Sequence, residues 1–105
     1  MEIKPYTADL LAQAQAAGRP VALHFHADWC PTCRAQEDVF NRLESDATLA
    51  LTLLVVDYDK ERELKRKLNV RVQSTLIVFR GKAERARLAG ETSEEKLKAA
   101  LRAAL

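Results

Sequence analysis

VALHFHADWCPTC, residues 21–33, joins an apolar run to a pair of cysteines. The run from Val21 to Ala27 is typical of a central strand that is covered on both sides, since only His24 and His26 interrupt its apolar faces. A helix is expected to follow, because Pro31 suits a first helical turn, where its missing N–H group is not needed. The segment therefore predicts a buried strand whose carboxyl end leads into a helix that begins at the cysteines.

Helix-like and strand-like stretches alternate on both sides of this segment. Thr92 and Glu95 match a capping box at the start of the last helix. Strands separated by helices pair in parallel, and the last two strands are expected to form an antiparallel hairpin. The predicted fold is α/β, a three-layer α/β/α sandwich in which four helices flank a central mixed sheet of four to five strands. The expected helices span residues 7–17, 30–45, 60–68 and 92 or 93 onward, and the expected strands span 21–27, 51–57, 75–80 and 85–89, with a short strand near Ile3.

Length, charge and hydropathy narrow the class of protein. The 105 residues correspond to one domain, residues 1–105, and 48% apolar with 30% charged residues is a globular composition. A net charge of +2, with both signs mixed along the chain, argues against a nucleic-acid partner. Leu49–Val56 is too short to span a membrane, and Met1–Tyr6 is too short and polar for a signal peptide. We expect a cytoplasmic monomer without a membrane partner, although an exported protein lacking its signal would share this pattern.

Cys30 and Cys33 are the only cysteines. A disulfide across two residues closes a very small loop and removes little entropy from the unfolded chain, so the pair is a poor structural staple. Cys30 is expected at a helix N-terminus, where free N–H groups and the helix dipole favour a thiolate. Cys33 follows one turn later on the same helix face. This arrangement suits disulfide exchange, with Cys30 as the nucleophile and Cys33 as the resolving thiol.

Other interpretations of the cysteine pair remain open. Zinc takes four ligands, and the nearby His24 and His26 are poor ones because their strand is buried, so no metal and no cofactor are expected. A metal or iron–sulfur centre would require two chains to pool their cysteines. A binding or redox-sensing module with weak or no turnover is the main alternative to an enzyme.

Two segments resemble the thioredoxin family. Ala27–Cys33, after an apolar strand, is similar to its active-site segment, and Ser74–Phe79 followed by Gly81 is similar to its later strand and turn. The similarity extends from about Val21 to the C-terminus. It implies a thioredoxin-like fold and a protein-disulfide oxidoreductase that acts as a reductant, with roles in electron transport and cell redox homeostasis. Its implied partners are protein disulfide substrates and an upstream reductase.

The resemblance also implies residues around the cysteines. A substrate groove is expected beside Trp29. The implied supporting residues are Trp29, Pro31, Thr32 and His24, and the implied substrate-binding residues are Trp29, Gln73, Ser74 and Thr75.

Three positions depart from the family pattern. Ser74 stands where the family has a proline after a cis peptide bond. A cis bond before a non-proline residue costs about 3–4 kcal/mol, so we expect either a trans bond or local strain. His24 stands where thioredoxins carry a buried acid that helps to move the proton of the resolving cysteine, and Val55 stands where a lysine partners that acid. The joint loss of acid and lysine leaves no charge buried alone.

The two histidines have alternative interpretations. A neutral His24 is a candidate for the proton transfer performed by the missing acid, because its unperturbed pKa is near the physiological range; the alternative is a core histidine held by a hydrogen bond. His26 is a candidate to tune the pKa of Cys30. The alternative for His26 is a surface-edge residue that packs against Asp28 or Arg34.

Overall fold

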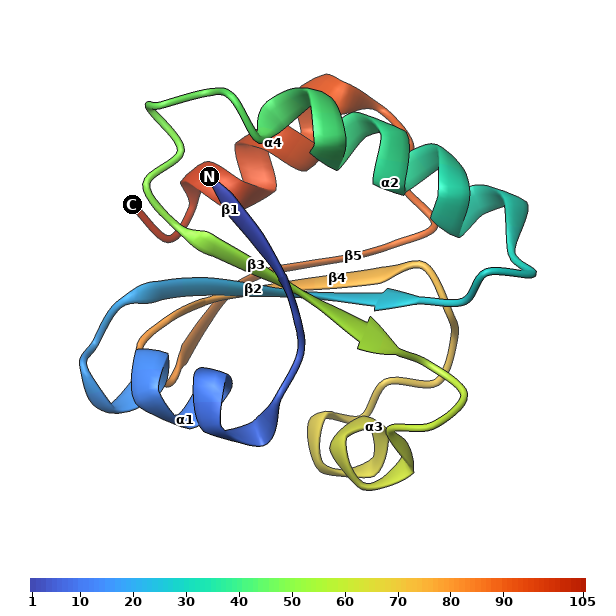
Figure 1. Cartoon of the computed structure of the whole chain (residues 1–105), viewed down its shortest axis with the longest axis horizontal. Coiled ribbons are helices and arrows are strands. Elements are labelled where there is room, and N and C mark those ends of the chain that lie inside the picture. Colours follow the sequence, from blue (N-terminus) through green and yellow to red (C-terminus); the bar gives the residue numbers. More distant parts are fainter.

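The computed structural model describes residues 1–105 and places a five-stranded sheet between two pairs of helices (Figure 1). The strands lie in the order β1-β3-β2-β4-β5, with β1, β3 and β2 parallel and with β4 and β5 each antiparallel to its preceding neighbour. This confirms the predicted three-layer sandwich, including the short first strand and the terminal hairpin. The elements are β1 (Glu2–Pro5), α1 (Ala8–Ala16), β2 (Pro20–His26), α2 (Pro31–Leu43), β3 (Thr52–Asp57), α3 (Arg62–Leu68), β4 (Thr75–Arg80), β5 (Ala83–Ala89) and α4 (Glu94–Arg102).

The core consists of two apolar clusters, one on each face of the sheet. Helices α2 and α4 cover one face, where Phe40 and Leu97 share a cluster with Ala22. Helices α1 and α3 cover the other face, where Leu11 and Leu64 share a cluster with Phe25 (Figure 1). Successive β2 side chains point to opposite clusters, as the alternation in residues 21–26 predicts. β2 is therefore a central strand that is buried on both faces.

Helix ends agree with the predicted signals except at the last helix. Thr7 caps α1 by accepting a hydrogen bond from the N–H group of Leu10, and Asn69 ends α3 with φ of +57°. The predicted capping box of Thr92 with Glu95 is wrong. Ser93 is the N-cap of α4 and accepts from the N–H group of Lys96 at 3.3 Å, because the helix begins one residue later than the box requires.

The sheet brings the residues before β4 next to the residues after β2. Phe25 of β2 pairs with Thr75 of β4, and the N–H group of Ser74 donates to the carbonyl oxygen of Phe25 at 2.9 Å. Since β2 and β4 run antiparallel, the chain enters β4 at the edge where β2 ends. Ser74 is thereby placed beside Cys30 and Cys33, although it lies 44 positions after Cys30 in the chain.

Candidate functional site

Cys30 is the N-cap residue of α2. Its Sγ atom accepts a hydrogen bond from the backbone N–H group of Cys33 at 3.2 Å. A serine or aspartate oxygen takes this position in an ordinary helix cap. Pro31 occupies the first helical position, where its lack of an N–H group removes no hydrogen bond. The sulfur of Cys30 thus lies at the positive end of the helix dipole, as the sequence predicts.

The two thiols differ in access and in acidity. Cys30 retains 3% of its surface exposed, while Cys33 is fully buried. Burial opposes ionisation of Cys30, but hydrogen bonds from the Cys33 thiol, the Ser74 hydroxyl and the N–H groups of Cys33 and Thr32 together lower its pKa. Burial raises the pKa of Cys33, and its hydrogen bond to Cys30 raises that pKa further. Cys30 is therefore the more acidic and the less buried of the two thiols.

Ser74 lies between the two sulfurs. Its buried hydroxyl oxygen is 3.2 Å from Sγ of Cys30 and 3.1 Å from Sγ of Cys33. The peptide bond before Ser74 is trans, and its φ of +65° is a left-handed conformation that costs a non-glycine residue about 1–3 kcal/mol. Backbone bonds offset this cost, because the Ser74 N–H donates to Phe25 and its carbonyl accepts from the N–H of Gly90. The position matched to a family proline therefore carries a hydroxyl within hydrogen-bond reach of both cysteines.

Gln36 of α2 is the site residue that the sequence analysis missed. Its fully buried amide nitrogen donates to the carbonyl oxygens of Ser74 at 3.0 Å and Glu91 at 2.8 Å. Gln36 thus ties the loop before β4 and the loop before α4 to the helix that carries the cysteines. The burial of Gln36 could have been predicted from its spacing. It follows Cys33 by three residues and precedes Phe40 by four, which places all three on the buried face of the helix.

His24 is part of the same network but has no hydrogen bond to either sulfur. Its Nε2 atom lies 2.9 Å from Oε1 of Gln36. Because the Gln36 amide nitrogen faces two carbonyl oxygens, its oxygen faces His24, and His24 must donate through Nε2–H. Burial lowers the pKa of His24 to about 4, so the ring is neutral near pH 7. The geometry matches a core histidine held by a hydrogen bond, and proton transfer by His24 remains a prediction.

Protein stability is expected to decrease as the pH falls from about 6.5 to about 4, because the unfolded chain protonates His24 first. The shift from 6.5 to about 4 corresponds to a loss of about 3 kcal/mol. Urea unfolding at several pH values would measure this slope. The control is His24→Gln, whose amide can still donate to Gln36. An equal slope in His24→Gln over this interval would contradict the assignment.

His26 is buried rather than a surface-edge residue, which corrects the sequence-based expectation. Its Nε2 atom lies 3.0 Å from Oδ1 of Asp28 and 3.9 Å from a carboxylate oxygen of Glu37. The predicted packing against Asp28 is confirmed, and the partner on α2 is Glu37 instead of Arg34. Burial follows from the position of His26 at the end of the central strand, beneath the chain that leads to the cysteines.

Trp29 is a prominent exposed residue beside the cysteines. The ring is 59% exposed, and its Nε1–H group donates to Oδ2 of Asp59 at 2.8 Å. A hollow of about 380 Å³ beside Trp29 has Asp28, Asp57 and Asp59 among its lining residues, and neither cysteine lines it. The hollow beside Trp29 has an acidic rim, and a role in binding substrate remains a prediction.

The remaining predicted site residues lie around the cysteines in different environments. Thr75 is buried and its hydroxyl donates to the carbonyl oxygen of Val72 at 2.8 Å, so it braces the loop before β4. Thr32 and Gln73 are half-buried, and Pro31 is exposed at the start of α2. Their roles in supporting the cysteines or binding substrate remain predictions.

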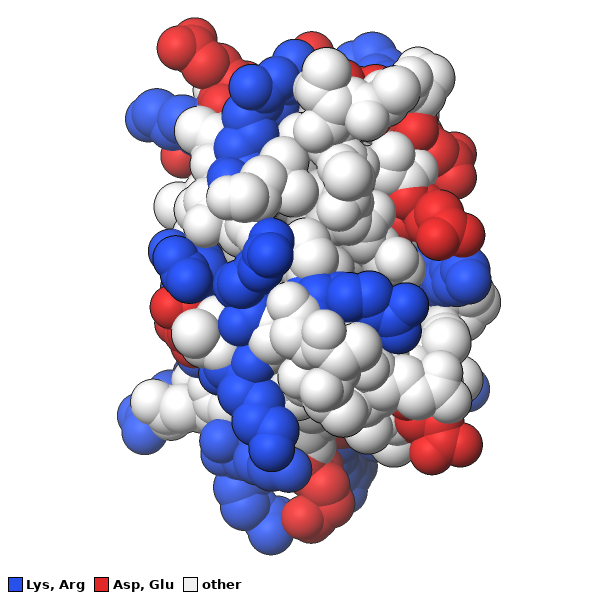
Figure 2. All heavy atoms as spheres, turned by 90° about the vertical axis from the view of Figure 1, so that its left-hand side faces the viewer, with Lys and Arg blue, Asp and Glu red and all other residues white.

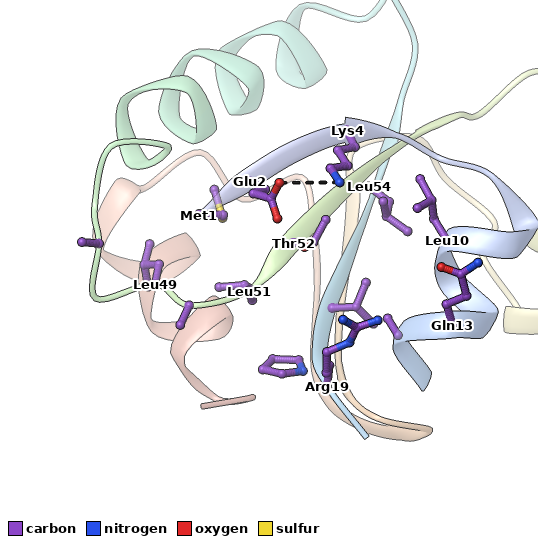
Figure 3. Close-up of a pocket in the computed structure, with 15 residues that line it drawn as sticks. Met1, Glu2, Lys4, Leu10, Gln13, Arg19, Leu49, Leu51, Thr52 and Leu54 are labelled. Carbon is purple, nitrogen blue, oxygen red and sulfur yellow. Dashed lines mark ion pairs between the residues drawn. The ribbon is translucent and has the colours of Figure 1, made fainter. Parts of the chain in front are cut away.

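The hollow at the other end of the sheet is lined by no cysteine or histidine. A hollow of about 520 Å³ lies at the amino ends of β2 and β3, where Glu2 and Lys4 form an ion pair (Figure 3). Figure 2 shows a run of Lys and Arg side chains with acidic groups at its margins, on the side of the molecule away from the start of α2.

No three His, Cys, Asp or Glu side chains gather as a metal site. No helix has the length and apolar character needed to cross a membrane.

Comparisons with known proteins agree with this geometry. The family profile described as Thioredoxin matches residues 4–103. The crystal structure of Trxlp from Edwardsiella tarda superposes with a TM-score of 0.90 at 36% identity, covering 95% of this chain and 98% of that one.

Two sequence relatives align over part of their length. Thioredoxin 2 of Plasmodium falciparum is 34% identical over 67 residues, which are 64% of this chain and 43% of the relative. The bifunctional thioredoxin reductase/thioredoxin of Mycobacterium leprae is 31% identical over 74 residues, or 70% of this chain and 16% of that protein. The alignments thus cover less than half of the length of either relative.

Proposed function

The chain belongs to the thioredoxin family, and we propose that it is a thiol–disulfide oxidoreductase acting on protein disulfides. The observation that carries this proposal is the sulfur of Cys30, which caps α2 and has a lowered pKa beside a second, fully buried thiol. Disulfide exchange needs a thiolate nucleophile, a second thiol in reach and access for the partner. Cys30 supplies the thiolate and the access, and Cys33 supplies the second thiol.

The proposed reaction has two displacements. The Cys30 thiolate attacks one sulfur of the substrate disulfide, the substrate S–S bond breaks, and the other substrate sulfur leaves as a thiolate. Cys33 then gives up its proton and attacks the Cys30 sulfur, which releases the second substrate thiolate and forms the Cys30–Cys33 disulfide. The proton from Cys33 ends on a departing substrate sulfur. Two electrons pass from the cysteine pair to the substrate.

We also propose the direction of electron transfer, the oligomeric state and the cellular location. The chain acts as a reductant, with an upstream reductase returning two electrons to the Cys30–Cys33 disulfide. One relative supports this, because its name joins a thioredoxin reductase to a thioredoxin. The proposed form is a monomer with a single domain, residues 1–105. Use of the only two cysteines for exchange fits a cytoplasmic location.

The wild-type protein is expected to accelerate the reduction of insulin disulfides by dithiothreitol well above the rate of dithiothreitol alone. Turbidity from the released insulin chain would measure the rate. The oxidised protein should lose two titratable thiols and regain both after reduction, since both cysteines are free in the reduced form. A rate equal to that of dithiothreitol alone, together with tight binding of a partner, would instead favour the binding or redox-sensing module.

A further inference from the structure

One hydroxyl group contacts both reacting sulfurs. The Ser74 oxygen lies 3.2 Å from Sγ of Cys30 and 3.1 Å from Sγ of Cys33, and Ser74 is only 3% exposed. A serine hydroxyl has one proton to donate and lone pairs to accept with. It can therefore donate to only one sulfur at a time while accepting an S–H bond from the other.

Building on the proposed function, we propose that Ser74 is a catalytic residue that donates its hydroxyl hydrogen bond to Cys30 in the first displacement and to Cys33 in the second. In the reduced protein the Ser74 hydroxyl donates to the Cys30 thiolate. Once Cys30 is joined to the substrate, its sulfur no longer carries a charge. A rotation about the Cβ–Oγ bond then lets the same hydroxyl donate to the sulfur of Cys33 as it loses its proton.

The backbone of Ser74 is fixed, and this leaves the hydroxyl proton as the mobile part. The N–H group donates to Phe25, and the carbonyl oxygen accepts from Gly90 at 3.0 Å and from Gln36 at 3.0 Å. These bonds involve β2, α2 and the segment after β5, so they hold the backbone of Ser74 beside the two sulfurs. Hydrogen bonds to a charged group are stronger than those between neutral groups, so the hydroxyl favours whichever sulfur is ionised.

The proposal assigns to Ser74 an effect that the matched proline of the family pattern cannot supply, since proline has no hydroxyl. The hydroxyl lowers the pKa of both thiols, which is the direction each displacement requires. No proton is consumed, because the Ser74 proton stays on its oxygen throughout. The two electrons follow the path given above, from the cysteine pair to the substrate.

Ser74→Ala is expected to raise the pKa of Cys30 by about one unit, because it removes a hydrogen bond that stabilises the charged thiolate. The rate of Cys30 alkylation by iodoacetamide below that pKa should fall about tenfold. Alkylation would be followed across about pH 5 to 9, with the modified residue identified by peptide mapping. The breakdown of a mixed disulfide between Cys30 and a small thiol should slow as well, because the hydroxyl also serves Cys33.

Ser74→Gly is the second variant, because glycine accepts the positive φ and lacks the hydroxyl. Ser45→Ala is the matched control, since the exposed Ser45 bonds only the Arg42 carbonyl oxygen. Both Ser74 variants should share the shifted alkylation profile even where their melting temperatures differ. Wild-type turnover of insulin with unchanged profiles in Ser74→Ala and Ser74→Gly would overturn the role of Ser74. Absence of turnover in the wild type would instead overturn the function on which it rests.

Discussion

Replacing Cys30 by serine is expected to reduce insulin reduction to the rate of dithiothreitol alone. A serine hydroxyl remains protonated at neutral pH, so the first displacement has no nucleophile. Cys33→Ser should also stop turnover, but at a different point. Cys30 can still attack the substrate, and no thiol remains to release it. The mixed disulfide should then persist and be visible as a covalent complex in a non-reducing gel, with its linkage at Cys30 identified by peptide mapping.

The two variants control for one another, because each replaces one sulfur by oxygen at the same helix end. Thermal unfolding of both would show that loss of activity is not loss of fold. If Cys30→Ser forms the persistent complex and Cys33→Ser does not, the nucleophilic and resolving roles are exchanged. Such a result would conflict with the full burial of Cys33 and the slight exposure of Cys30.

The features that the sequence predicted well depend on local patterns. The two-residue alternation from Val21 to His26 gave the two faces of β2, and Pro31 marked the start of α2. The cysteine pair could be placed at the helix N-terminus because both signals lie within a few residues of each other. Local patterns predicted the exact first residue of a helix less well, because a helix boundary can shift by one residue. The last helix shows this, since its N-cap is Ser93 and not Thr92.

The contacts around the two sulfurs could not be predicted from local sequence patterns, because they join residues that are far apart in the chain. Ser74 was predicted as a substrate-binding residue and as a departure from the family proline, without its contacts to the sulfurs. Its position between Cys30 and Cys33 depends on the antiparallel pairing of β2 with β4. Gln36 contacts residues 38 and 55 positions away in the chain. A polar residue on an apolar helix face signals a buried hydrogen-bonding group, but it does not identify the partners, because these depend on how the loops before β4 and α4 pack.

Gln36→Leu is expected to destabilise the protein by about 3 kcal/mol, because it leaves the buried His24 N–H group and the part-buried Glu91 carbonyl oxygen without partners, at about 1–3 kcal/mol each. The change removes the acceptor of the His24 Nε2–H group and the donor to the carbonyl oxygens of Ser74 and Glu91. Since 1 kcal/mol shifts the melting temperature of a domain of this size by about 4–8 °C, Tm should fall by more than about 10 °C. Urea unfolding at neutral pH would give the free energy directly.

A double-mutant cycle with His24→Leu separates the network from simple loss of volume. His24→Leu alone leaves the Gln36 oxygen without its donor, whereas the double variant removes both members of that bond. The double variant should be less destabilised than the sum of the single variants by about 1 kcal/mol or more, since replacing both partners by apolar groups removes the unpaired atoms. Gln13→Leu, on the exposed face of α1, is the control and should change stability by less than about 0.5 kcal/mol. Strict additivity would mean that Gln36 contributes through packing alone, and the hydrogen-bonded link from β2 through α2 to Ser74 would then add nothing to stability.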